Sequence, residues 1–376
     1  MEGDHHIQRI TSPYMRAVMS RFEKRRIRYA VRMGLLSFVM GAVAAFLFTW
    51  DQPSVKVAGD PAIWSFVLLT FFISLVTSVI GYRLLAYEQE KVSRLERLAQ
   101  GRSRRKGWAQ RFIVSFAVAW ILATACLAVF LFVISKWLES ADLSRFVMML
   151  LAAMYAAILG AGVTFFIVGV DSVELFFVFA GLTAGAVLFS ATIATNREWW
   201  QRSVSALGID PGSGLFFNIS IILVGLVVMT YARDLIDDLK LLTEMQLYPS
   251  SGYNFMRFGL TGIGLSIVGI GLFPTEGLPF SHFLHQSTAY VVVGISFVGM
   301  FFLSKIVPTV YPKGFIYGSA ALGVLCLVVI ISYTPIHLEF AWMELILFFL
   351  IGVWIGSLGH ETEKYVRRQP AIARHG

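Results

Sequence analysis

Long apolar blocks, separated by shorter polar segments, run along almost the whole chain. Each block has about 20 residues, the length that an α-helix needs to cross the ~30 Å hydrocarbon layer of a membrane. The blocks do not alternate apolar and polar residues, as the strands of a transmembrane barrel would. The pattern predicts an all-α, polytopic membrane protein with about ten transmembrane helices, at residues 34–50, 63–84, 112–136, 146–168, 174–195, 214–231, 255–273, 286–304, 314–333 and 338–357.

One apolar stretch, residues 146–195, is too long for a single span. Only Asp171 and Glu174 interrupt it. One helix of that length would be far longer than the bilayer is thick. We therefore expect two spans joined by a tight cytoplasmic hairpin, in preference to a re-entrant segment, and we interpret Asp171 and Glu174 as a polar turn rather than an ion port.

Composition supports the same class of protein. The chain has 376 residues, of which 57% are hydrophobic and 14% are charged, whereas a soluble domain has about 25% charged residues. This excludes a soluble enzyme and a secreted domain. The two cysteines, Cys126 and Cys326, both lie inside apolar blocks, which favours neither a disulfide framework nor a paired zinc site.

Charge predicts the orientation. With the N-terminus inside, 26 of the 31 basic residues fall on the cytoplasmic side, including those at the span edges. We therefore expect both termini in the cytoplasm and the protein in the cell (plasma or inner) membrane. The predicted organisation is a basic tail at 1–33, a four-span module at 34–168 with a basic loop at 85–111, a six-span module at 169–357 and a tail at 358–376.

Two predicted cytoplasmic segments carry a helical pattern. Residues 88–100 are followed by a basic cluster, and 235–245 repeat apolar residues at helical spacing, as an amphipathic helix leaving the sixth span does. The cluster could contact anionic lipid headgroups or serve only to orient the chain, and no nucleic-acid motif accompanies it. It consists of Arg102, Arg104, Arg105 and Lys106.

Polar residues gather at the opposite, outer ends of the later spans. Ionisable groups inside or at the edge of a bilayer are costly, so they are candidates for function. We predict an outer-face polar pocket formed by Glu198, Ser203, Ser205, Asn218, Glu276, His282, His285, His337 and Glu344.

Within this set, the histidines allow several kinds of chemistry. His282 and His285 are three residues apart and face the same way on a helix, so with a carboxylate they could hold zinc. They could equally form a proton relay, bind a phosphate headgroup or only anchor the helix ends at the interface. Glu344 lies inside the last span and needs a partner, for which His337, seven residues earlier, is the candidate.

From the fifth span onward the chain resembles a bacterial and archaeal family of six-span membrane proteins of unknown function. The matching segments are 203–208 (Ser-Val-Ser-Ala-Leu-Gly), 217–219 with Gly225, and 271–274 (Gly-Leu-Phe-Pro) followed by His282 or His285. It is more distantly similar to the damage-regulated autophagy modulator and related lipid-remodelling membrane families. The six-span family usually has an acid just before the Leu-Gly pair, whereas this chain has Ala206.

Three functions remain open on the sequence. The first is an integral membrane protein that handles lipid or binds a partner through the outer-face pocket, without a cofactor. The second is a metal-dependent lipid hydrolase or transferase that uses the histidines. The third is a proton-coupled transporter with Glu344 or Asp171 as the coupling site. Membrane lipids are the predicted partners, and nucleic acid is not.

Overall fold

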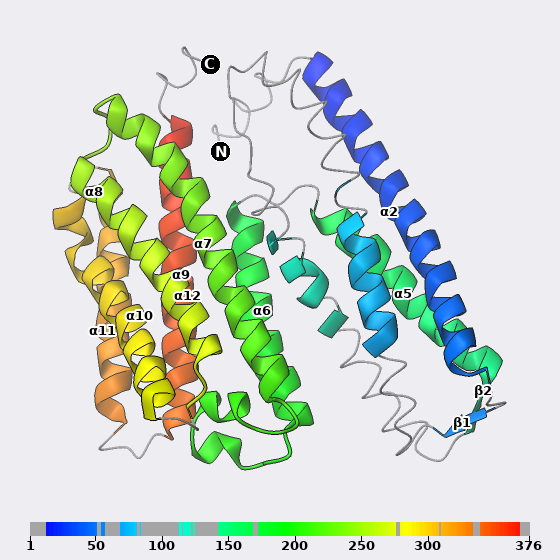
Figure 1. Cartoon of the computed structure of the whole chain (residues 1–376). Helices are drawn as coiled ribbons and strands as arrows, with labels where there is room; N and C mark the ends of the chain where they lie inside the picture. Colours follow the sequence, from blue (N-terminus) through cyan, green and yellow to red (C-terminus); the bar gives the residue numbers. More distant parts are fainter. Residues whose placement is uncertain are drawn as a thin grey trace. The chain divides into compact units, whose positions relative to one another are not determined.

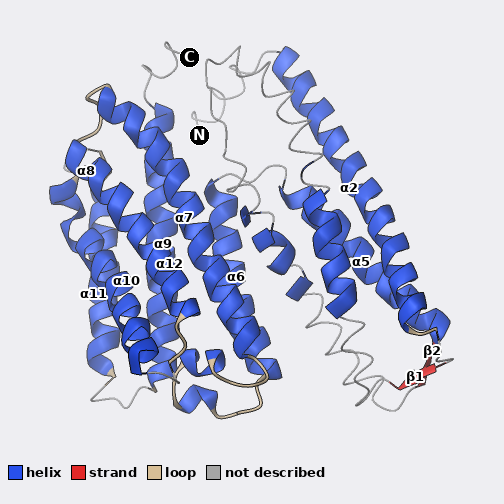
Figure 2. Ribbon diagram, viewed as in Figure 1, coloured by secondary structure: helices blue, strands red, loops and turns tan. Residues whose placement is uncertain are grey.

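The computed structural model is almost entirely helical over the residues that it describes, apart from one short pair of strands (Figure 2). The described residues are 13–50, 54–56, 68–80, 83, 113–114, 116–121, 123–124, 142–167, 172–275, 279–307, 310–333 and 339–368. The all-helical class predicted from the apolar blocks is confirmed.

Seven helices in the described part of the chain are long and apolar enough to cross a membrane. They are Ile27–Leu47, Arg145–Phe165, Gly214–Glu244, Ser250–Leu272, Pro279–Ile306, Lys313–Ser332 and Phe340–Thr362. Two shorter apolar helices, Leu68–Ile80 and Val178–Ile193, fall on the second and fifth predicted spans. The multi-pass character is therefore confirmed, while the count of ten and the orientation stay predictions.

The chain divides into two compact units, which we describe separately. Unit 1 comprises Met1–Leu98 and Leu122–Gly169, and unit 2 comprises Ala99–Ile121 and Val170–Gly376. The predicted division into a four-span and a six-span module stays a prediction.

Unit 1 is built on two helices, α2 (Pro13–Phe48) and α5 (Arg145–Ile167), which lie side by side (Figure 1). Small residues allow the two backbones to approach closely. A Cβ atom added to Gly41 would lie 2.8 Å from the carbonyl oxygen of Ala152, and one added to Gly34 would lie 3.0 Å from Cβ of Ala161. The interface therefore has no room for larger side chains at either glycine.

Two three-residue strands, β1 (Ser54–Lys56) and β2 (Asp142–Ser144), pair antiparallel at one end of unit 1, with Val55 opposite Leu143 (Figure 1). Beside them, Nη2 of Arg145 donates a hydrogen bond to the carbonyl oxygen of Trp50 at 2.7 Å. The hydrophobic pattern predicted no strand here.

Unit 2 contains the helices from α6 onward (Figure 1). They are α6 (Ser172–Ile193), α7 (Gly214–Glu244), α8 (Ser250–Phe255), the π-helical turn η3 (Met256–Leu260), α9 (Thr261–Leu272), α10 (Pro279–Ile306), α11 (Lys313–Ser332) and α12 (Phe340–Arg368). Because α5 ends at Ile167 and α6 begins at Ser172, the 50-residue apolar stretch forms two helices, as expected.

Glycines bring α7 and α9 into backbone contact. A Cβ atom on Gly225 would lie 2.6 Å from the carbonyl oxygen of Gly264. Elsewhere in the unit, Trp354 of α12 is fully buried, and its Nε1 donates to Oγ of Ser319 on α11 at 2.8 Å. The indole fills space that Gly299 of α10 leaves open. Small residues on one helix and a large residue on another thus make the core.

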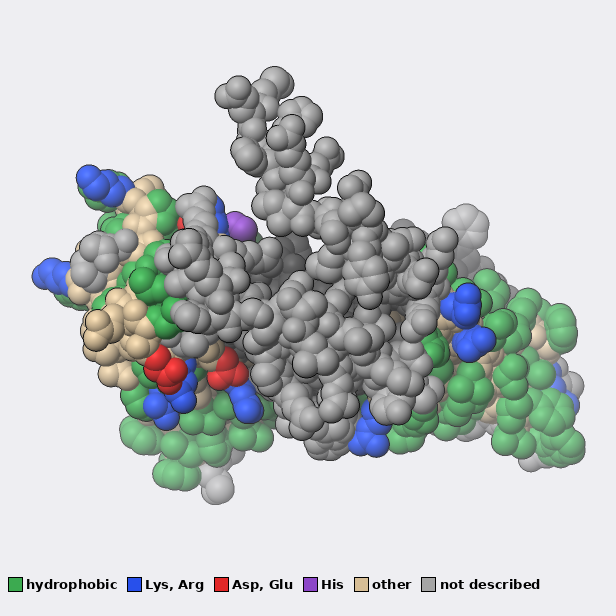
Figure 3. Space-filling view, turned by 90° about the horizontal axis from the view of Figure 1, so that it is seen from above, with side chains coloured by type: hydrophobic (Ala, Val, Ile, Leu, Met, Phe, Trp, Pro, Cys, Tyr) green, Lys and Arg blue, Asp and Glu red, His purple; other side chains and the backbone are tan. Residues whose placement is uncertain are grey.

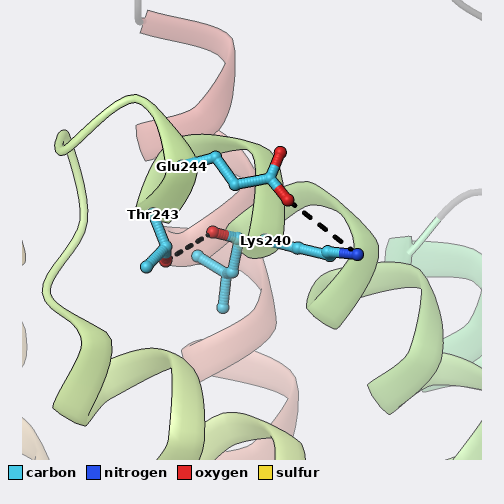
Figure 4. A network of polar contacts seen from close by, with 4 residues as sticks. Lys240, Thr243 and Glu244 are labelled. Atoms are coloured by element: carbon cyan, nitrogen blue, oxygen red, sulfur yellow. Dashed lines mark hydrogen bonds and ion pairs between the residues drawn. The ribbon is translucent and has the colours of Figure 1, made fainter.

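The predicted amphipathic helix after the sixth span is the continuation of α7, which runs without a break to Glu244. Its apolar residues Leu235, Leu239 and Leu242 are buried in the unit. On the other face, Lys240 and Glu244 form an ion pair at 3.9 Å, and Thr243 bonds back to the carbonyl of Leu239 (Figure 4). The apolar stripe therefore packs against the protein itself.

At this end of unit 2, tyrosines connect the α7–α8 loop, the α10–α11 loop and α12. The hydroxyl of Tyr311 lies 2.7 Å from Oγ1 of Thr362 and 3.5 Å from the hydroxyl of Tyr248. The hydroxyl of Tyr365 donates to the carbonyl of Leu247 at 2.7 Å. Burial raises the pKa of Tyr248 and of Tyr311.

Acidic and basic side chains lie near one another on the surface seen from above (Figure 3).

Candidate functional site

The candidate site lies at the other end of unit 2, where α6 and α9 end and α7, α10 and α12 begin (Figure 1). The connection from α6 to α7 forms two short 3-10 turns there, η1 (Trp199–Gln201) and η2 (Val204–Gly208). The turn η2 is largely buried, and Leu207 at its centre is not exposed at all. The site is therefore made by a loop folded in against the helix ends.

A buried carboxylate, Asp210, holds this loop in shape. Its oxygens accept hydrogen bonds from the backbone N–H groups of Thr195, Asn196, Gly212 and Ser213 at 2.8–3.1 Å, and from the Thr195 hydroxyl at 2.7 Å. Burial alone would raise the pKa of the Asp210 carboxyl, but the hydrogen bonds from Thr195, Asn196 and Gly212 bring it well below its ordinary range. The ionised carboxylate ties the end of α6 to the start of α7.

Further polar contacts fix η2 itself. Oγ of Ser203 accepts from the backbone N–H of Ala206 at 3.1 Å and so caps the turn. Nδ2 of Asn218, in the first turns of α7, donates to the carbonyl of Gly208 at 2.8 Å. A Cβ atom on Gly208 would lie 2.6 Å from Oδ1 of Asn218, so a larger residue at this position would have to displace the Asn218 side chain.

A series of hydrogen bonds joins α12, η2 and α10. Oε2 of Glu344 accepts from the backbone N–H of Val204 at 2.6 Å, and the Ser205 hydroxyl lies 3.3 Å from Oε1 of Glu344. Nε2 of His285 lies 3.1 Å from Oγ of Ser205, and Nδ1 of His285 lies 2.7 Å from the carbonyl oxygen of Phe273. We call the Phe273 carbonyl, His285, Ser205 and Glu344 the polar chain.

The hydrogen-bond inventory fixes part of the protonation pattern. A carbonyl oxygen only accepts, so Nδ1 of His285 carries the hydrogen that binds Phe273. In the neutral imidazole Nε2 is then the free base. The single hydrogen of the Ser205 hydroxyl can be donated to Oε1 of Glu344, at 3.3 Å, or to Nε2 of His285, at 3.1 Å. The polar chain therefore presents a serine hydroxyl to the basic nitrogen of an oriented histidine.

The surroundings of the polar chain are apolar and partly exposed. The His285 side chain is buried, with 7% of its surface exposed. Large exposed side chains stand near the starts of α10 and α12, namely Phe280, Phe283, Phe340 and Trp342. Trp is enriched at membrane–water interfaces because its ring is amphipathic, and exposed phenyl rings are suited to contact with lipid chains.

Other predicted pocket residues lie outside the polar chain. His282 is exposed, and its Nδ1 lies 2.9 Å from the carbonyl oxygen of Thr275. Glu198 is exposed in the loop before η1. Ser203 and Asn218 support the loop as described above.

Several sequence-based candidates lie outside the described residues. They are Glu276 and His337 of the predicted pocket, the basic cluster Arg102, Arg104, Arg105 and Lys106, and Asp171. The proposed pairing of His337 with Glu344 thus stays a prediction, although Glu344 has partners in η2. Among the described residues, no three His, Cys, Asp or Glu side chains lie close enough together to hold a metal ion.

Ser205, His285 and Glu344 were among the candidates predicted from the sequence, but two features of the site were not predicted. Asp210 had no predicted role in shaping the loop, although Asp210-Pro-Gly-Ser before a span is a turn and helix-start signal. The Phe273 carbonyl had no predicted role either, since no sequence pattern reveals it.

No family model matches the chain, and no curated protein or solved structure matches it either.

Proposed function

We propose that this integral membrane protein handles a membrane lipid, whose headgroup region binds at the polar chain. The observation that supports this proposal is the part-buried contact between Glu344, Ser205 and His285 at the ends of otherwise apolar, membrane-length helices. Polar side chains at such positions are costly and are functional candidates.

The depth of the polar chain fits a lipid ligand better than a ligand from bulk water. Glu344 is the fifth residue of α12, so at 1.5 Å per residue it lies about 6 Å along the helix from Phe340. A group at that depth below the helix start meets the boundary between headgroups and hydrocarbon. The exposed rings of Phe280, Phe283 and Trp342 would lie against acyl chains beside it.

The orientation belongs to the same proposal. The distribution of basic residues favours an outer-face position for the polar chain. It favours a cytoplasmic position for the basic loop with Arg102, Arg104, Arg105 and Lys106, where that loop would meet anionic headgroups. The resemblance of spans five to ten to lipid-remodelling membrane families is consistent with a lipid ligand, and membership of the six-span family is proposed on the same residues.

Native mass spectrometry of the protein released from lipid nanodiscs tests the proposal. We expect the wild-type protein to retain one or more lipids, and His285→Ala to retain at least tenfold less. The matched control is His282→Ala, which removes an exposed histidine three residues away that also contacts a backbone carbonyl. Equal lipid retention by wild type and His285→Ala would refute the proposal.

Proton-coupled transport is the second candidate, because Glu344 is a carboxylate inside a membrane-length helix. It predicts that Glu344→Gln abolishes pH-gradient-driven uptake in proteoliposomes while lipid retention persists. Lipid handling predicts instead that His285→Ala loses the bound lipid and that neither the wild type nor the variant transports a solute.

A further inference from the structure

The half-buried Ser205 hydroxyl differs from the buried hydroxyls of the described chain in what it faces. Most of those hydroxyls donate to the carbonyl four residues earlier in their own helix, as in Ser74, Thr164, Ser220 and Ser296. Such a hydroxyl is occupied by the backbone. Ser205 lies in a 3-10 turn and contacts a histidine and a carboxylate from two other helices.

We propose that Ser205 is the nucleophile of an acyl-transfer reaction on a lipid ester, with His285 as its general base. The nucleophile and base are within hydrogen-bond reach, at 3.1 Å, and a third group orients the base, the Phe273 carbonyl at 2.7 Å on Nδ1. This is the arrangement by which an adjacent base activates a serine. The proposal deepens the lipid-handling function and rests on it for the nature of the substrate.

Glu344 acts as a positioning residue in this scheme. Its Oε2 accepts from the backbone N–H of Val204, the residue before the nucleophile, and its Oε1 contacts the Ser205 hydroxyl. These two contacts fix both the backbone and the side chain of Ser205 against α12. The reacting proton moves between Ser205 and His285.

The substrate class follows from the depth of the site. The ester carbonyls of glycerolipids lie between the headgroups and the hydrocarbon, and the polar chain lies at that level if the helix ends sit at the interface. An acyl ester would therefore reach Ser205 while its chain remains beside the exposed rings of Phe280 and Phe283.

The reaction balances with the groups named. Oγ of Ser205 bonds to the ester carbonyl carbon while its proton passes to Nε2 of His285. The carbon–oxygen bond to the alcohol then breaks, and His285 returns the proton to the alcohol oxygen. Water, or the hydroxyl of an acceptor lipid, then attacks the acyl carbon and gives its proton to Nε2 of His285. The bond between the acyl carbon and Oγ of Ser205 breaks, and His285 passes the proton to Oγ, which leaves a fatty acid or a new ester and restores the serine.

A long-chain alkyl fluorophosphonate tests the proposal on the full-length protein in nanodiscs. This probe phosphonylates activated serines, and peptide mass spectrometry locates the adduct. We expect a single major adduct on Ser205 in the wild type, none in Ser205→Ala, and at least a hundredfold slower labelling in His285→Gln, since general-base catalysis contributes 10²–10⁴-fold. Ser251→Ala, which changes an exposed serine in α8, should label like the wild type.

If Ser205→Ala fails to fold, Ser205→Cys provides a second test of the proposed nucleophile. Its thiol should react faster with iodoacetamide than the thiol of Ser205→Cys/His285→Gln. An unlabelled Ser205 in folded wild-type protein, or equal labelling of Ser205 in wild type and His285→Gln, would overturn the proposal.

Lipid retention separates this proposal from the proposed function. Lipid retained by the wild type without a Ser205 adduct would refute the nucleophile and leave lipid handling standing. An adduct on Ser205 in a protein that retains no lipid would support the nucleophile and refute lipid binding as its context.

Discussion

Replacing Asp210 by asparagine should loosen the loop that carries Ser205. The two carboxylate oxygens together accept from Thr195, Asn196, Gly212 and Ser213. An asparagine keeps one acceptor oxygen and turns an NH₂ group toward the second set of donors. In the wild type, the backbone N–H of Asn196 donates to Oδ2 of Asp210 at 2.9 Å. In the variant, an NH₂ group at the position of Oδ2 would face this N–H, so two donors would be in contact.

The magnitude follows from the number of charge-assisted hydrogen bonds lost. A hydrogen bond to a charged group contributes about 1.5–3 kcal/mol, and a buried donor left without an acceptor costs about 1–3 kcal/mol. Asp210→Asn loses one bond to a backbone N–H and weakens the rest, so we expect roughly 2 kcal/mol. Asp210→Ala removes every acceptor and should cost roughly 4 kcal/mol, in the range for breaking a buried charged network.

The pH dependence distinguishes the loss of the carboxylate's charge from a purely steric effect of the asparagine side chain. Because the pKa of Asp210 in the folded protein is below its unfolded value of about 3.9, its contribution to stability is present above about pH 4. That contribution is lost as the pH falls through the folded pKa. The difference in stability between wild type and Asp210→Asn should therefore shrink in acid.

Thermal unfolding of the detergent-solubilised protein, followed by tryptophan fluorescence, measures both effects. We expect Asp210→Asn to lower the midpoint by roughly 4–8 °C at pH 7, since about 1 kcal/mol shifts a domain of this size by roughly 2–4 °C. The deficit should narrow between pH 4 and pH 2. An unchanged midpoint at pH 7, or a deficit that is the same at pH 7 and pH 2, would refute the reasoning.

Two further predictions concern packing and the tyrosine contacts. Gly225→Ala should cost about 1–3 kcal/mol of stability through overpacking and so lower the thermal midpoint, because its Cβ would lie 2.6 Å from the Gly264 carbonyl oxygen. Gly294→Ala, whose Cβ would have nothing within 4 Å, should leave the midpoint unchanged or raise it slightly. Equal midpoints for the two variants would contradict the close packing. Tyr311→Phe removes the hydroxyl 2.7 Å from Oγ1 of Thr362 and should cost about 1 kcal/mol in the same assay, and a variant as stable as wild type would show that this contact contributes nothing.

The helices could be predicted because each apolar block carries its own signal. The span predicted at 314–333 and the helix Lys313–Ser332 agree within one residue. The span predicted at 214–231 and the amphipathic helix predicted at 235–245 form one continuous helix, α7, which ends at Glu244 and has Leu235, Leu239 and Leu242 buried. Local periodicity located that stripe, but only the fold shows that it packs inside unit 2.

Long-range contacts could not be predicted in the same way. The strands β1 and β2 have three residues each and pair across 88 positions, so neither carries a local signal. Likewise Ser205 and Glu344 are 139 residues apart, and nothing in either segment names the other as its partner. The sequence pattern placed Ser205, His285 and Glu344 in one set of candidates, while their pairing depends on the loop geometry.

The contacts of Glu344 couple stability to the candidate site. A carboxylate in an apolar helix requires hydrogen-bond donors, and here the donors are the backbone N–H of Val204 and the Ser205 hydroxyl. These donors are in place only while the loop is folded in, and Asp210 closes that loop. Loosening the loop at Asp210 should therefore also remove the partners of Glu344 and separate Ser205 from His285, so Asp210→Asn should reduce fluorophosphonate labelling of Ser205 without changing any residue of the polar chain.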